Sequence, residues 1–189
     1  MRRCIAFTDE AGRGPLAGPV VAAVVVVQGA RALPAVKDSK QLSESKREAI
    51  FEELISHSGI VWATGMVSER VIDRINIFEA TKLAMKRAFF RLPFSPELLV
   101  IDGNFFLDLP VSQQAVVKAD ETIFGCQAAS IIAKVTRDRM MRRYDARFPG
   151  YGFARHKGYG TVFHREKIQE LGPCPIHRMS FAPLRERGE

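Results

Sequence analysis

An unbroken run of eight apolar residues, Val20–Val27, limits this chain to a small set of folds. All eight are valine or alanine, so both faces of an extended strand would be apolar here. Such a strand belongs in the interior of a sheet that is covered on both sides. Residues 4–8 form another predicted strand, and the short link through a glycine-rich turn predicts that the two are antiparallel neighbours.

The rest of the chain alternates between strand-like and helix-like patterns. Three further strands are predicted, at residues 60–67, 98–103 and 115–120. Helices are predicted after the capping residues Ser43 and Asn76, over residues 123–146 and 161–171, with one short turn after Ser68. This order predicts an α/β fold with a mixed five-stranded sheet flanked by helices. We expect one domain over residues 1–189, including a short loop and helix segment over about 148–189.

Composition narrows the class of protein. No apolar run approaches the roughly 18 residues of a membrane span, and the first residues lack a signal-type apolar region. The three cysteines, Cys4, Cys126 and Cys174, form neither a CxxC pair nor a zinc pattern. We expect a cytoplasmic protein with no membrane partner and with buried or incidental thiols.

The net charge of +7 is compatible with a polyanionic partner, although a basic enzyme without such a partner has the same charge. Position is more informative than the total. Basic residues crowd into one third of the chain, at Arg137, Arg139, Arg142, Arg143, Arg147, Arg155, His156, Lys157, Arg165 and Lys167.

Three apolar segments each end in an aspartate: Asp9 (followed by Glu10), Asp102 and Asp120. Strand ends in open α/β sheets gather at one edge, so these four carboxylates are expected to converge. Close carboxylates raise one another's pKa, and divalent cations bound through oxygen relieve the repulsion. Two ions about 4 Å apart can activate water and stabilise the leaving oxygen of a phosphodiester. Each aspartate alone is equally typical of a helix cap or a turn, and only their combination favours a metal site.

Gly12-Arg13-Gly14 follows the acidic pair directly. Glycines allow close backbone approach, and their N–H groups can donate to a phosphate or to the ribose 2′-hydroxyl that separates RNA from DNA. Most such triplets are only tight turns.

Other candidate contacts to a nucleic acid are more dispersed. Ser39 and Lys40 precede a predicted helix and could hold a phosphate, or belong to a solvated capping loop. Ser130, Lys134 and Arg137 could line a groove for the sugar–phosphate backbone, or form a solvated helix face. Tyr159, flanked by glycines, could stack on a sugar or base. His177 is interpreted as a structural histidine rather than a ligand.

Six ordered blocks of sequence resemble the ribonuclease HII family, also called type 2 ribonuclease H. They extend over nearly the whole chain, at residues 9–20, 38–43, 102–103, 128–139, 156–161 and 172–178.

The resemblance implies a ribonuclease H-like fold and an endonuclease that cuts the RNA strand of RNA/DNA hybrids. It also implies incision 5′ to single ribonucleotides in duplex DNA, leaving 3′-hydroxyl and 5′-phosphate ends, with two Mg²⁺ or Mn²⁺ ions. The family's metal ligands fall on Asp9, Glu10, Asp102 and Asp120, and its 2′-hydroxyl sensor falls on Gly12, Arg13 and Gly14. Tyr159 matches the junction-sensing tyrosine, and Lys40 matches a phosphate-contacting lysine. We expect a monomer.

The chain departs from the family at Ala119, where many bacterial members have glycine, and over residues 121–127. Two other functions stay open. One is a nucleic-acid-binding module with vestigial carboxylates, against which the four retained acids argue. The other is a DNA nuclease of the resolvase or transposase kind, against which the Gly12–Gly14 turn and Tyr159 argue.

Overall fold

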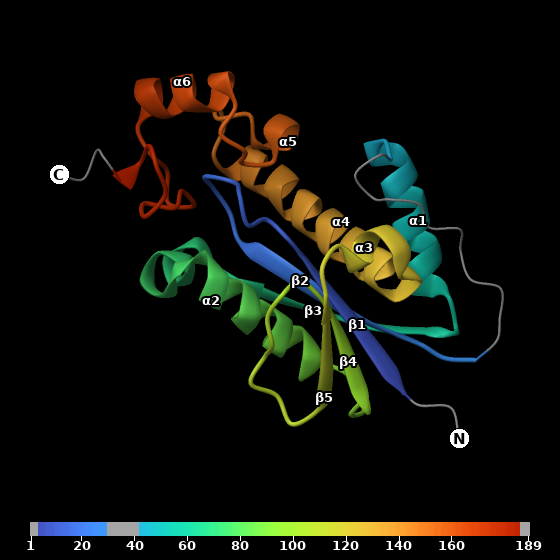
Figure 1. Cartoon of the computed structure of the whole chain (residues 1–189). Helices are drawn as coiled ribbons and strands as arrows, with labels where there is room; N and C mark the ends of the chain where they lie inside the picture. Colours follow the sequence, from blue (N-terminus) through green and yellow to red (C-terminus); the bar gives the residue numbers. More distant parts are fainter. Residues whose placement is uncertain (1–3, 30–41, 186–189) are drawn as a thin grey trace.

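A mixed five-stranded sheet runs through the middle of the protein, as predicted from the sequence (Figure 1). The computed structural model describes residues 4–29 and 42–185. The strands are β1 (Ile5–Ala11), β2 (Val20–Val27), β3 (Ile60–Val67), β4 (Leu98–Asp102) and β5 (Ser112–Val116). Their order in the sheet is β3-β2-β1-β4-β5. β2 is antiparallel to β1 and β3, whereas β1, β4 and β5 are mutually parallel.

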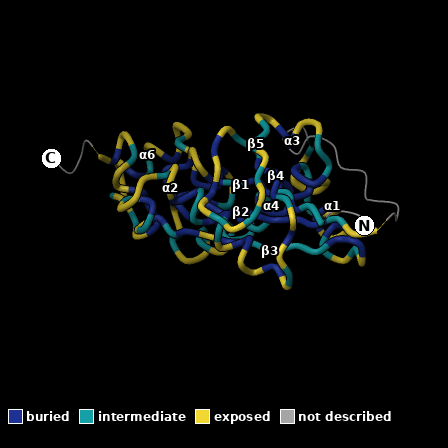
Figure 2. The backbone as a smooth tube through the Cα atoms, turned by 60° about the horizontal axis from the view of Figure 1, so that its bottom comes forward, coloured by how far each residue is buried: buried dark blue, intermediate teal, exposed yellow. Residues whose placement is uncertain are grey.

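The valine-rich run forms β2 and is buried on both faces, which confirms its predicted interior position. Alternate side chains enter two separate cores, because successive residues of a strand point to opposite faces. Ala22, Val24 and Val26 pack in the core beneath α2 (Glu69–Phe89). Ala23 and Val25 pack in the core beneath α1 (Glu44–Ser56) and α4 (Phe124–Arg147). Figure 2 shows the buried strands between the more exposed helices and turns.

The helix boundaries follow capping residues. Ser43 caps α1 by accepting a 3.3 Å hydrogen bond from the Lys46 N–H. Asn76 interrupts α2 with a φ of 64°, and its Oδ1 accepts from the N–H groups of Phe78 and Glu79. The kink at Asn76 divides this span into two helical parts, and Asn76 caps the second part as predicted. Thr161 caps α6 (Val162–Leu171).

The predicted strand over residues 115–120 was wrong in its bounds. Lys118 adopts a left-handed conformation, with a φ of 58°, which ends the extended chain and starts the short helix α3 (Ala119–Thr122). The strand instead begins at Ser112, in a polar stretch that alternation of apolar residues does not reveal. It lies at the sheet edge, where the Gln113 side chain bonds the backbone of Leu107 through both its amide atoms.

The segment after α4 folds back onto the turn between β1 and β2, with α5 (Phe153–His156) lying beside the end of α4 (Figure 1). The Leu16 N–H donates to Gly158 O and the Gly18 N–H donates to Ile176 O, each over 2.8 Å. Within the described part of the chain, no helix has the length and apolarity needed to cross a membrane.

Candidate active site

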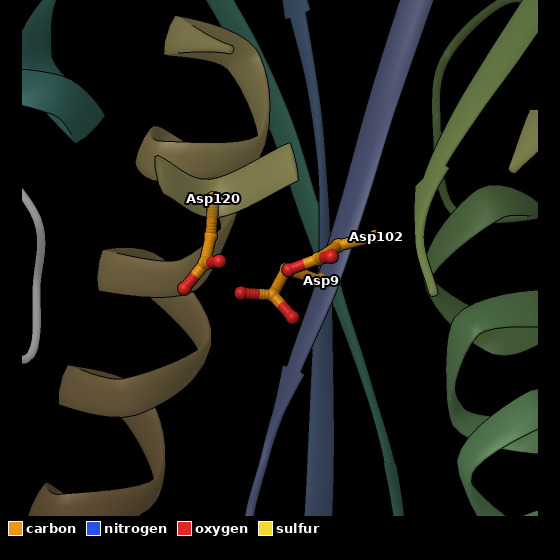
Figure 3. A group of neighbouring side chains, drawn as sticks. All are labelled: Asp9, Asp102 and Asp120. Carbon is orange, nitrogen blue, oxygen red and sulfur yellow. The ribbon is translucent and has the colours of Figure 1, made fainter. Parts of the chain in front are cut away.

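Three aspartates meet where the parallel pairing of β1 with β4 ends. One carboxylate oxygen from each of Asp9, Asp102 and Asp120 lies within 4.8 Å of the others (Figure 3). Thr8 pairs with Ile101 in the parallel register of β1 and β4, so the next residue of each strand is an aspartate at the same level. Asp120 arrives from α3 rather than from a strand end.

Backbone N–H groups hold two of these carboxylates in place. Asp102 Oδ1 accepts a 3.0 Å hydrogen bond from the Ala119 N–H, which brings α3 and therefore Asp120 toward the sheet. Asp9 Oδ1 accepts a 2.6 Å hydrogen bond from the Glu10 N–H. Asp9 and Asp120 are buried, with 7% and 4% of their surface exposed. The positions of the acids are thus set by backbone geometry.

Burial and neighbouring negative charge make Asp9 and Asp102 difficult to ionise. Burial raises the pKa of Asp9 well above its usual range, and the charges of Glu10 and Asp102 raise it further. Burial also raises the pKa of Asp102, and the charge of Asp120 adds to this. Three hard carboxylate oxygens at this spacing are the donors that Mg²⁺ and Mn²⁺ accept, so the residues fit a divalent metal centre.

Glu10 lies beside the three aspartates but outside their close group. It still interacts with two of them, because its side chain hydrogen-bonds with Asp9 and the charge of Asp102 raises its pKa. Its Oε1 lies 3.4 Å from Nη1 of Arg13, whose charge partly offsets the rise that burial causes in the pKa of Glu10. The predicted fourth ligand borders the adjoining cavity, and its role as a ligand stays a prediction.

A cavity of about 500 Å³ adjoins the acids. It is lined by Glu10, Ala11, Gly12, Arg13, Gly14, Arg47, Ser130, Lys134 and Tyr159. The structure therefore brings together the predicted Gly12–Gly14 turn, two residues of α4 and the tyrosine. Ser130 also contacts the acids. Its side chain hydrogen-bonds to Asp9, and this bond partly offsets the rise in the pKa of that carboxyl.

Tyr159 stands at the border of this cavity, with 45% of its surface exposed. Lys134 Nζ lies 5.9 Å from the centre of its ring, within the range of a cation–π contact. A Cβ atom placed on Gly14 would lie 3.8 Å from Tyr159 Cε1, so the ring and the glycine turn are in close proximity. An exposed aromatic ring here is available to a ligand.

The expected contact between Arg137 and substrate was wrong. Only 1% of Arg137 is exposed, and its guanidinium donates to the carbonyl oxygens of Pro19, Lys157 and Ala17 over 2.9 to 3.0 Å. Helical spacing placed Arg137 on the same face as Ser130 and Lys134. At Arg137, however, that face is covered by the turn between β1 and β2.

The remaining predicted residues are two in the 38–43 block, one histidine and the basic third of the chain. Ser39 and Lys40 lie outside the described residues. His177 is buried, with its Nε2 3.1 Å from His164 Nε2, in agreement with a structural histidine. Two residues of the basic third, Arg139 and Arg142, form ion pairs with glutamates of α1.

Sequence reasoning missed Arg47 and Arg178. Arg47 lines the cavity from α1, four residues after the Ser43 cap, and that closeness to the 38–43 block was the available signal. Arg178 is fully buried beneath the Gly12–Gly14 turn. Its signal was its place in the 172–178 block, beside the histidine that drew attention there.

Comparison with known proteins gives one consistent result. A sequence model of the family described as ribonuclease HII matches residues 7–184. The ribonuclease HII of Geobacter metallireducens is 51% identical, over 96% of this chain and 85% of its own length. That of Carboxydothermus hydrogenoformans is 50% identical, over 96% of this chain and 78% of its own.

Solved structures of ribonucleases H2 and HII resemble the fold of this chain. The ribonuclease H2 of Pyrococcus horikoshii superposes with a TM-score of 0.77 at 30% identity, over 96% of this chain and 95% of that one. The ribonuclease HII of Archaeoglobus fulgidus, solved in complex with PCNA, has a TM-score of 0.79 at 30% identity, over 94% and 95%. These likenesses confirm the fold predicted from the sequence.

Proposed function

Because the chain belongs to the ribonuclease HII family of metal-dependent endoribonucleases, we propose that it also incises duplex DNA at single embedded ribonucleotides. Ribonuclease H activity on RNA/DNA hybrids comes with the family. The proposed cut lies 5′ to the ribonucleotide and leaves 3′-hydroxyl and 5′-phosphate ends. The supporting observation is the cavity beside the three aspartates, which is lined by Glu10, the Gly12–Gly14 turn and Tyr159.

We assign the metal ligands to Asp9, Asp102 and Asp120, with Glu10 as the fourth carboxylate. Two divalent ions, Mg²⁺ or Mn²⁺, would neutralise these acids, activate water and stabilise the leaving oxygen. The protein's own contribution is to hold the carboxylates in place before substrate arrives. The Ala119 N–H fixes Asp102, and the Glu10 N–H together with Ser130 fixes Asp9.

The other residues that line the cavity suit a nucleic-acid strand. Arg13, Arg47 and Lys134 supply positive charge for phosphates. The backbone of the Gly12–Gly14 turn can donate to a ribose 2′-hydroxyl, which a deoxynucleotide lacks. The exposed ring of Tyr159 can pack on the neighbouring sugar. A nuclease that ignored the sugar would need no such pairing of a polar turn with an aromatic ring.

We also propose that the chain acts as a single-domain monomer. The backbone hydrogen bonds from Leu16 to Gly158 and from Gly18 to Ile176 hold the C-terminal segment against the turn between β1 and β2 of the same chain. Light scattering after size exclusion should give a mass near 21.1 kDa, and twice that mass would contradict a monomer.

A cleavage assay tests the main proposal. A DNA duplex with one ribonucleotide and a matched all-DNA duplex are incubated with the protein and Mg²⁺ or Mn²⁺. We expect one nick, 5′ to the ribonucleotide, and no nick when EDTA removes the metal. Cutting of the all-DNA duplex would favour a DNA nuclease of another kind. Binding without any nick would favour a module with vestigial acids.

A further inference from the structure

We propose that Arg178 is a positioning residue that turns the N–H groups of Arg13 and Gly14 toward the cavity. The inference rests on the proposed function, because it concerns the turn that we assign to ribose recognition. It also accounts for a fully buried guanidinium that has no part in holding metal.

The Arg178 guanidinium donates hydrogen bonds to carbonyl oxygens of the turn. Nη2 donates to Gly12 O over 2.6 Å, and Nη1 donates to Arg13 O over 2.9 Å. Nε and Nη2 both donate to Gly18 O, over 2.9 and 2.8 Å. A buried charge is costly unless its donors are satisfied, and here three backbone carbonyls satisfy them.

Because peptide groups are planar, these hydrogen bonds to the carbonyls also fix the direction of the N–H groups that follow them. In each such group the C=O and the following N–H point in opposite directions. The carbonyls of Gly12 and Arg13 face the buried guanidinium, so the N–H groups of Arg13 and Gly14 face the other way. Residues 12–14 line the cavity, whereas the buried Arg178 does not border it. Among the described residues, neither amide donates a hydrogen bond within the protein, which leaves both available to an external acceptor.

The turn needs such a restraint because of its glycines. Gly12 has a φ of +102°, which L side chains rarely adopt, and a glycine on each side of Arg13 lets both peptide planes rotate easily. Arg178 itself is held firmly. Its N–H donates to Leu16 O over 2.8 Å, and its Cζ lies 5.0 Å from the centre of the Phe181 ring. A rigid side chain thus restrains a soft turn.

The Arg178→Lys variant tests the proposal, because one ammonium group does not reproduce the planar fork that reaches three carbonyls. The readout is the preference of the protein for a single-ribonucleotide duplex over an all-DNA duplex. Fluorescence anisotropy gives both dissociation constants, with Ca²⁺ in place of Mg²⁺ to prevent turnover. We expect the preference to fall about tenfold, with little change in binding to the all-DNA duplex.

The Met85→Ala variant is the matched control for lost stability. Met85 is a fully buried residue of α2 in the core between that helix and the sheet, and it does not border the cavity. We expect this truncation to lower the melting temperature and leave the preference for ribonucleotide as in wild type. An equal loss of preference in both variants would overturn the proposal, as would an unchanged preference in Arg178→Lys. If wild type itself shows no preference, the proposed function fails as well.

If Arg178→Lys does not fold, nuclear magnetic resonance on the wild-type protein provides the test. We expect couplings across the hydrogen bonds from the Arg178 guanidinium to the carbonyl carbons of Gly12 and Arg13. The amide signals of Arg13 and Gly14 should shift with the single-ribonucleotide duplex and not with the all-DNA duplex. Missing couplings, or equal shifts with both duplexes, would overturn the proposal.

Discussion

The buried aspartates and the buried arginines of this protein have opposite surroundings. Asp9, Asp102 and Asp120 face one another, and the pKa of Asp9 and of Asp102 is raised by burial and by neighbouring negative charge. Arg137 and Arg178 instead face backbone carbonyls, three for each guanidinium. The acidic group therefore needs cations from outside, whereas the arginines are complete without a ligand.

The two regions therefore have separate tasks. The acids provide the charge for chemistry, and the arginines hold the backbone that surrounds the cavity. A change in the acids should therefore remove activity and spare the fold. A change in the arginines should first remove stability or recognition.

The Asp102→Asn variant should give the largest effect on activity. It keeps the shape of the side chain and removes one negative charge from the metal site. We expect cleavage of the single-ribonucleotide duplex to fall by about a thousandfold or more, with binding of the duplex largely intact. Steady-state cleavage and anisotropy measure the two quantities.

Asp108→Asn is the matched control for this prediction. Asp108 is a fully exposed aspartate whose carboxylate pairs with Lys86 on the surface. We expect activity close to that of wild type. Equal activity of the Asp102→Asn variant would remove Asp102 from the metal site.

Replacement of Arg137 should give the next largest effect, on stability. Arg137→Ala would leave three buried carbonyls without their donors, and we expect a loss of about 3 kcal/mol in the free energy of unfolding. Arg139→Ala removes two partly exposed ion pairs, with Glu48 and Glu52, and should cost about 1 kcal/mol or less. Urea unfolding compares the two variants, and equal losses would contradict the structural role of Arg137.

The histidines behind the cavity are a third case, because they are buried in the neutral form. Burial lowers the pKa of His164 from 6.5 to about 4, and its Nδ1 lies 2.9 Å from Tyr159 O. A depressed pKa means that the unfolded chain takes up the proton first. The stabilising contribution is therefore complete above about 6.5 and is lost as pH falls toward about 4.

We expect the His164 contribution to the free energy of unfolding to fall by about 1 to 2 kcal/mol between about pH 7 and about pH 5. Urea unfolding of wild type and His164→Gln at both pH values measures it by difference. The acids titrate in both proteins, so their contribution cancels. An identical pH dependence of the two proteins would contradict the assignment to His164.

Loss of the Tyr159 ring should give the smallest effect. The ring is exposed, so Tyr159→Ala should leave stability nearly unchanged and slow cleavage at single ribonucleotides about tenfold. Tyr159→Phe keeps the ring and should retain most of the rate. If Tyr159→Ala cleaves as fast as wild type, the ring does not pack on the substrate.

The sequence predicted features that depend on local pattern. The valine-rich run could only be an interior strand, and Asn76 carried its own capping signal. Asp9 and Asp102 were correctly placed together because β1 and β4 are parallel neighbours, although β1 continues past Asp9 to Ala11. Asp120 also lies with them, but on a short helix rather than at a strand end. That helix starts at the left-handed Lys118, which the spacing of apolar residues does not predict.

The sequence did not predict which residues are buried by segments that are distant along the chain. Helical spacing put Arg137 on a face with Lys134, but spacing says nothing of the turn that packs over that face. Arg178 lies in a loop without periodicity, and its partners are more than 150 positions away in the sequence. Contacts of that kind depend on the whole fold.

The most direct test of the account is the melting temperature of the protein with and without Mg²⁺, measured for wild type and Asp102→Asn. If the acids form a cation site, metal binding relieves their repulsion and stabilises the folded state. We predict that Mg²⁺ raises the melting temperature of wild type by roughly 3 to 5 °C and that of Asp102→Asn far less. No rise in wild type, or an equal rise in both proteins, would contradict the account.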